Sequence, residues 1–173
     1  MRSEDDTRYR LDVVAPCVVD AVRFAGGWLV DRVMAGWDVT VLIGADEDVR
    51  PLDILGVDTM DLESVLVSWQ DRPHPQTVAV AADLFNSDER VRRGVLGALE
   101  QGRTEVTLWG DGCPAELSVD PVRHELSAAA RAFKAQALAA ANAPDAVSVG
   151  YTEAFRCGVM AFRSVPADLI AVG

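Results

Sequence analysis

The spacing of hydrophobic residues changes twice within residues 13–44, and these changes predict a strand, a helix and a second strand. Apolar residues recur every three or four positions over residues 18–33, which is typical of an amphipathic helix. The flanking runs, residues 11–15 and 39–43, are short and mainly apolar, as in strands that are covered on both faces. The segment therefore predicts the beginning of an α/β layer structure.

A second strand–helix–strand unit is predicted over residues 78–109. Residues 78–82 form an uninterrupted apolar run, and either Ser87 or Asp88 can cap the helix that follows. The chain returns as a strand over residues 106–109, and we expect the crossover between the two parallel strands to be right-handed.

The rest of the chain carries weaker patterns. Residues 52–55 predict a strand or a hairpin arm, and residues 62–69 fit a short helix or a strand equally well. The further expected elements are a loop over residues 70–76, a long helix opened by Asp120 and Pro121, a strand over 147–149, a helix over 152–162 and a last strand over 169–172. Residues 1–10 are strongly charged and predict a disordered tail.

Together these elements predict one domain over residues 11–173. The fold class that they indicate is α/β, as a single three-layer domain with a mostly parallel sheet of five or six strands, either Rossmann-like or flavodoxin-like. A chain of 173 residues is long enough to bury one sizeable core of this kind.

The charge of the chain narrows the range of partners. Its formal net charge is -11, which repels phosphate backbones and anionic membranes, so we expect no binding to nucleic acid and none to membranes. No stretch reaches the roughly 18 apolar residues of a membrane span. Arginine supplies all but one of the basic residues, and the single lysine, Lys134, excludes a phosphate-binding P-loop. This composition is typical of a bacterium with a GC-rich genome.

Three cysteines at wide spacing do not indicate a disulfide framework, and the charged amino terminus lacks the apolar core of a signal peptide. A reducing cytoplasm is therefore the expected location.

Ligands of open parallel sheets bind at the carboxyl ends of the strands, so the residues that follow each predicted strand are the first candidates. This rule selects Asp46, Asp83 and the glycine-rich turn Gly110, Asp111 and Gly112 as ligand-binding candidates. The carboxylates could hold a magnesium ion, or they could be solvated turn residues. We assign no metal and no cofactor from these residues, because no Cys/His spacing typical of a metal site is present.

Cys17, Cys113 and His124 are the catalytic candidates. Cys17 falls in the first turn of the first helix, where free N–H groups favour a thiolate. Cys113 lies in a glycine-rich turn after a strand, and His124, eleven residues further on, could serve as its base. Each has a simpler interpretation, as a small buried side chain for the cysteines and as an exposed helix residue for His124.

No catalytic signature stands out, and the sequence therefore favours a non-catalytic regulatory or protein-interaction module. Such a module could be a homodimer formed through Trp28, Gly26 and Gly27, or it could bind another protein. Two alternatives stay open: an enzyme that binds a small molecule or nucleotide at the strand ends, and a redox sensor based on a cysteine.

Overall fold

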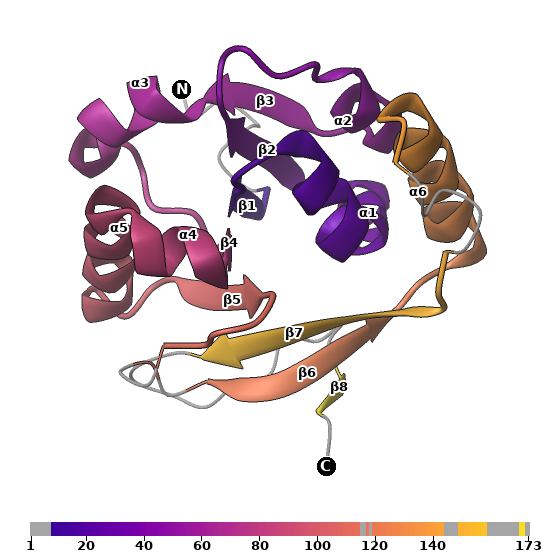
Figure 1. Ribbon diagram of the computed structural model, residues 1–173. Coiled ribbons are helices and arrows are strands. Elements are labelled where there is room, and N and C mark those ends of the chain that lie inside the picture. The colour runs from indigo at the N-terminus through magenta and orange to yellow at the C-terminus, as the bar shows by residue number, and fades with distance from the viewer. Residues whose placement is uncertain (1–7, 115–116, 118, 144–148, 159–169, 172–173) are drawn as a thin grey trace, which may run out of the picture.

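Helices cover both faces of one mixed β-sheet in the computed structural model, which describes residues 8–114, 117, 119–143, 149–158 and 170–171. Helices α1, α2 and α6 lie on one face, and helices α3, α4 and α5 lie on the other (Figure 1). This arrangement confirms a single α/β domain.

The strands are β1 (Arg10–Val14), β2 (Asp38–Ile43), β3 (Asp58–Asp61), β4 (Thr77–Ala81), β5 (Glu105–Trp109), β6 (Asp120–Glu125), β7 (Thr152–Gly158) and β8 (Ile170–Ala171). The helices are α1 (Val18–Met34), α2 (Arg50–Leu55), α3 (Leu62–Val67), α4 (Ala82–Ser87), α5 (Glu89–Glu100) and α6 (Ala128–Ala140), with a 3-10 turn, η2, at Trp69–Asp71.

The strand order across the sheet is β3-β2-β1-β4-β5-β7-β6-β8. The first five of these strands are parallel to one another, whereas β7, β6 and β8 join through antiparallel pairs. The expected mostly parallel sheet of five or six strands is therefore corrected to a mixed sheet with eight strands in the described residues. The parallel part comes from the alternating strands and helices of the first 109 residues. In the antiparallel part, β6 and β7 come from segments for which the sequence predicted helices, and β8 lies within the predicted last strand.

Both predicted strand–helix–strand units are present. The first consists of β1, α1 and β2, and the second runs from β4 through α4 and α5 to β5. The cap predicted for the second unit is also confirmed, because the Asp88 carboxylate accepts a hydrogen bond from the Arg90 N–H at the start of α5.

Three weaker predictions are wrong, and each error has a local cause. Residues 52–55 belong to helix α2, since Pro51 occupies its first turn and Gly56, with a φ of 82°, ends it. Asp120 and Pro121 begin strand β6, and the long helix starts only after its N-cap, Ser127.

Residues 152–158 form strand β7 instead of a helix. Their burial alternates strictly, with Glu153, Phe155 and Cys157 inside, which is the period of a strand. The sequence fits residues 62–69 to a helix or a strand equally well, and most of this segment is helix α3, which Asp61 caps. The predicted strand over 147–149 and the end of the predicted helix at Phe162 fall largely outside the described residues.

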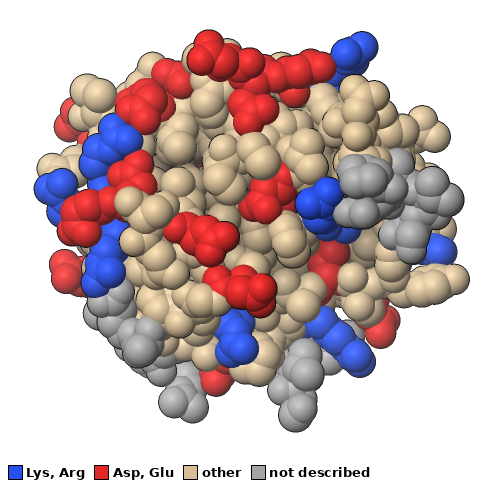
Figure 2. All heavy atoms as spheres, in the orientation of Figure 1, with Lys and Arg blue, Asp and Glu red and all other residues tan. Residues whose placement is uncertain are grey.

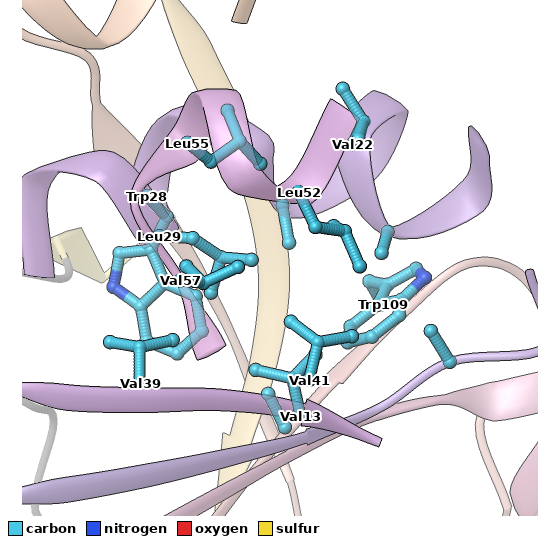
Figure 3. Close-up of a cluster of buried hydrophobic side chains, with 14 of the residues drawn as sticks. Val13, Val22, Trp28, Leu29, Val39, Val41, Leu52, Leu55, Val57 and Trp109 are labelled. Carbon is cyan, nitrogen blue, oxygen red and sulfur yellow. The ribbon is translucent and has the colours of Figure 1, made fainter. Parts of the chain in front are cut away.

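The core is divided between the two faces of the sheet. Val13 and Val41 face α1 and α2, whereas their neighbours Val14 and Leu42 face α3, α4 and α5. Figure 3 shows the first of these clusters, in which the indole of Trp109 extends from the end of β5 toward Leu52. Successive residues of the central strands therefore serve opposite cores, which explains their continuous apolar runs.

Gly26 and Gly27 lie inside α1, and both are buried. A Cβ at Gly27 would overlap the side chain of Leu126, so α1 can approach Leu126 this closely only because residue 27 is glycine. A Cβ at Gly26 would meet Val22 Cγ1 at 3.4 Å, which is ordinary contact. The close-packing role predicted for the pair is therefore confirmed at Gly27.

We predict opposite effects for alanine at these two neighbouring positions. Gly27→Ala should lower the free energy of unfolding by about 1–3 kcal/mol, because Leu126 must move in a packed core. Gly26→Ala should leave stability unchanged or raise it by up to about 1 kcal/mol, because alanine is the better helix former. Urea denaturation measures both. In the Leu126→Ala background, Gly27→Ala should cost less than in wild type, because the shortened side chain no longer overlaps the new methyl group. Equal stability of Gly27→Ala and Gly26→Ala would contradict this account.

Candidate functional site

The carboxyl ends of β1 and β4 meet at the point where the strand order reverses. Cys17 is the N-cap residue of α1 after β1, and it is partly buried. Asp83 lies in the first turn of α4 after β4, and it is exposed. The rule that selected these residues therefore placed them correctly at the carboxyl edge of the sheet.

Asp20 connects this edge to the end of β5. It lies in the first turn of α1, and its Oδ2 accepts a hydrogen bond of 3.0 Å from Nε1 of Trp109. Trp109 is the last residue of β5, and its side chain is buried. The hydrogen bond satisfies the buried indole N–H and ties α1 to β5, the last of the parallel strands.

The glycine-rich turn follows Trp109 directly. Gly110 and Gly112 have φ values of 87° and 81°, a conformation that side-chain-bearing residues rarely adopt, and Asp111 between them is exposed. Nδ2 of Asn86 donates a 2.8 Å hydrogen bond to the Gly112 carbonyl, which fixes the turn to α4. The backbone thus holds the Asp111 carboxylate at the surface.

Cys113 at the end of this turn is partly buried. Burial raises the pKa of its thiol, and this effect exceeds that of the nearby Arg156 charge, which lowers the pKa. The thiol form is therefore favoured at neutral pH, and the environment does not activate Cys113 as a nucleophile.

A cavity of about 450 Å³ opens beside the turn. Its lining includes Trp109, Gly110 and Asp111 from the end of β5, Arg23 from α1 and Arg156 from β7. The cavity forms because β7 continues past β5: the last β5 pair joins Leu108 to Arg156, and residues 152–155 pair with β6 alone. Two of the five ligand-binding candidates, Gly110 and Asp111, line it, whereas Asp83 and Cys17 are not among its lining residues.

A buried ion pair, Lys134 with Glu153, also lines this cavity. Nζ of Lys134 lies 2.7 Å from Oε2 of Glu153 and donates a 2.6 Å hydrogen bond to the Arg23 carbonyl. The Glu153 carboxylate accepts hydrogen bonds from the N–H groups of Gly27, at 3.0 Å, and Trp28, at 2.6 Å. The Arg23 carbonyl and the Gly27 N–H are partners in a regular helix, so the ion pair engages both halves of one helical hydrogen bond.

Burial raises the pKa of Glu153, while Lys134 and the two backbone donors oppose this shift. The pair is therefore held by direct contacts on every side, as a buried charge requires.

His124 and Asp31 form a second polar cluster between α1 and β6. Nε2 of His124 lies 2.7 Å from Oδ2 of Asp31, and the Ser127 hydroxyl donates a 2.5 Å hydrogen bond to Oδ1. Burial acts to raise the pKa of Asp31, but the hydrogen bonds from Ser127 and His124 outweigh it and hold that pKa below 3.8. Ser127 also caps α6, so this cluster fixes where α6 begins.

The remaining candidate, Asp46, is exposed in the loop after β2. No group of three or more His, Cys, Asp or Glu side chains among the described residues is placed to hold a metal ion. The described donor set therefore does not fit a metal centre, and the chemistry below is derived from the side chains alone.

Sequence reasoning missed Asp20, Arg23, Glu153 and Arg156. Asp20 could have been found, since it follows Cys17 by one helical turn at the end of the first strand. The others carry no local signal, because Glu153 and Arg156 were expected on a helix and meet α1 only through the tertiary fold.

Comparisons with solved structures identify enzymes of the same fold. A zinc-inhibited form of teicoplanin deacetylase has a TM-score of 0.64 at 15% identity, covering 86% of this chain and 97% of that one. N,N'-diacetylchitobiose deacetylase from Pyrococcus horikoshii has a TM-score of 0.56 at 11% identity, with 88% and 85% covered. The 4-carboxy-2-hydroxymuconate hydratase from Pseudomonas putida has a TM-score of 0.58 at 11% identity, with 91% and 98% covered.

No family model and no curated protein sequence matches the chain. At these identities, the likeness to solved structures establishes the fold. The predicted non-catalytic regulatory or interaction module is corrected by this comparison, because the chain shares its fold with several deacetylases.

None of the helices in the described part of the chain is long and apolar enough to cross a membrane. The expected cytoplasmic location and the absence of nucleic-acid binding stay predictions, and so does oligomer formation. The expected dimer surface is wrong, because Trp28, Gly26 and Gly27 are buried within the chain.

We predict that Lys134→Met lowers the free energy of unfolding by about 3–5 kcal/mol, because it leaves the Glu153 carboxylate buried without a counter-charge. The double variant Lys134→Met/Glu153→Met should lose less, since it leaves no buried charge without a partner. Urea denaturation at pH 7 measures both losses.

Arg50→Met is the matched control, because Arg50 and Asp48 form an exposed pair at 3.1 Å. Its effect should stay within about 0.5 kcal/mol. A double variant less stable than Lys134→Met would contradict this role of the buried pair.

We predict that Asp31→Asn is destabilising at pH 7 by about 1–3 kcal/mol and progressively less so in acid. A carboxylate whose pKa is lowered by folding adds stability above its unfolded pKa and loses that contribution as the pH falls through the folded value. The difference between wild type and variant should therefore shrink below about pH 4. Urea denaturation from pH 7 to pH 3 tests this, with the exposed Asp53→Asn as control, and a difference independent of pH would contradict it.

Proposed function

We propose that this protein is a hydrolase that acts on an N-acetylated small molecule in the cavity beside the turn of residues 110–112. The observation that carries the proposal is the composition of that cavity, which combines an exposed carboxylate, Asp111, with two guanidinium groups, Arg23 and Arg156. The shared fold supports the reaction class, because teicoplanin deacetylase and diacetylchitobiose deacetylase have the same arrangement of strands and helices.

The strand order supports the position of the site. The five parallel strands follow the order 3-2-1-4-5, which favours the Rossmann-like alternative, and such sheets bind ligands at the carboxyl ends of their strands. The hydrogen bond between Asp20 and Trp109 connects the edge where the strand order reverses with the cavity. The proposed site itself is the cavity that reaches from Asp111 to Arg156.

The side chains have complementary chemical roles in amide hydrolysis. Asp111 accepts a proton from the attacking water, and the positive charges of Arg23 and Arg156 stabilise the oxyanion that develops on the acetyl carbonyl. The carbon–nitrogen bond then breaks, Asp111 returns the proton to the departing amine, and acetate and the free amine are released. Trp109 and Phe24 supply apolar surface in the same cavity. Lys134 and Glu153 hold α1 beside the cavity and thereby position Arg23.

We predict that the protein releases acetate from N-acetylglucosamine or N,N'-diacetylchitobiose and that Asp111→Asn lowers kcat/KM by roughly 10²–10⁴-fold, since it removes the general base. Proton NMR of acetate measures the reaction, with and without added Zn²⁺. Asp83→Asn is the control, because Asp83 is exposed at the same edge but does not line the cavity. Absence of acetate from wild type in every condition would refute the hydrolase, and full activity of Asp111→Asn would refute the role of Asp111.

A further inference from the structure

A larger cavity, of about 700 Å³, lies on the other face of the sheet, between α5 and the segment from the end of α3 through η2. Its lining comes from α5 on one side and from residues 66–71 and His74 on the other. It shares no lining residue with the cavity beside Asp111. A volume in this range holds one small organic ligand.

Two glycines give one wall of this cavity a flat surface. A Cβ on Gly94 would lie 2.8 Å from Cε2 of Trp69, so the indole rests directly on the backbone of α5. Gly97, one turn further along α5, has no atom within 4 Å of its Cβ position. The surface beside the indole is therefore open at Gly97, and a planar ring can lie there against the helix and next to Trp69.

One arginine of the cavity is placed to bind an anion. Arg90 is not, because Glu63, at 2.6 and 3.0 Å, and Asp88 already take up its charge. Arg93 makes no ion pair with the acidic side chains of the described residues. Asp71 also lines the cavity, so the anion is expected at Arg93 alone. In Figure 2, basic and acidic atoms are interleaved on the side of the molecule where α3 and α5 lie.

The wall opposite α5 is fixed before any ligand binds. Arg72, directly after η2, donates two hydrogen bonds to the buried Asp12 carboxylate of β1, at 3.2 and 3.3 Å. Nη1 of Arg10 donates to the Pro73 carbonyl at 3.1 Å, and the Thr104 hydroxyl donates to the Pro75 carbonyl at 2.8 Å. A ligand therefore does not need to order this segment, which reduces the entropy lost on binding.

We propose that this cavity is a second binding site, separate from the proposed hydrolase site, and that it takes a planar aromatic carboxylate. The ring lies beside Trp69 on the surface left open at Gly97, and the carboxylate binds the guanidinium of Arg93. Arginine matches a carboxylate with two parallel hydrogen bonds, so it distinguishes the acid from a neutral ring of the same shape.

The test uses naphthalene-1-carboxylate and its neutral amide, naphthalene-1-carboxamide, titrated into the full chain by calorimetry. Wild type should bind the acid roughly tenfold more tightly than the amide, as expected for one charge-assisted contact. Arg93→Gln should abolish this preference without weakening the amide. Gly97→Leu should weaken both ligands roughly tenfold or more, because the new side chain starts from a Cβ position with open space around it and extends over the surface where the ring lies.

Arg103→Gln is the matched control, because Arg103 is exposed after the end of α5 and lies outside the cavity lining. It should leave both affinities unchanged, and so should Asp111→Asn, which separates this proposal from the hydrolase. The proposal is overturned by an absence of binding at millimolar concentration, by equal affinities of wild type for acid and amide, or by unchanged binding in Gly97→Leu.

Discussion

The buried ion pair between Lys134 and Glu153 is the interaction on which the arrangement around α1 depends. It joins α6, through Lys134, and β7, through Glu153, to backbone groups in the middle of α1. A buried charge is tolerated only when all its polar atoms are satisfied, and here the partners include a carbonyl and two N–H groups of a helix. Three elements that are distant in sequence are thereby fixed in one geometry.

The consequences of this contact extend to the cavity beside Asp111. Gly27 brings α1 against Leu126, and the Glu153 carboxylate reaches the helix backbone at the same residue. The cavity beside Asp111 exists because β7 passes the end of β5 and α1 covers it. The wall of the cavity along α5 is held independently, by Asp12 and Arg72, so the two cavities on opposite faces of the sheet are supported by separate contacts.

The structure also explains why only some of the site residues predicted from the sequence line the cavity beside Asp111. Gly110 and Asp111 line the cavity, because the turn after β5 lies where β7 and β6 diverge from the parallel sheet. His124 could be chosen from the sequence only as a neighbour of Cys113, yet its partner Asp31 lies 93 positions away in α1. Chemistry that depends on such distant pairs has no local signature.

The sequence by itself determined the centre of the parallel half of the fold. Continuous apolar runs and helical periodicity specify β1, α1, β2 and the unit from β4 to β5, whereas α2 and the edge strand β3 carry no such pattern. Only the tertiary structure decided the antiparallel half. Val122 and Leu126 recur at helical spacing, but pairing between β6 and β7 places Val122 in a strand, and Leu126 follows the end of that strand. Glu153 appeared as an ordinary charged residue, and its burial against α1 gave it a role that no neighbour in the sequence could predict.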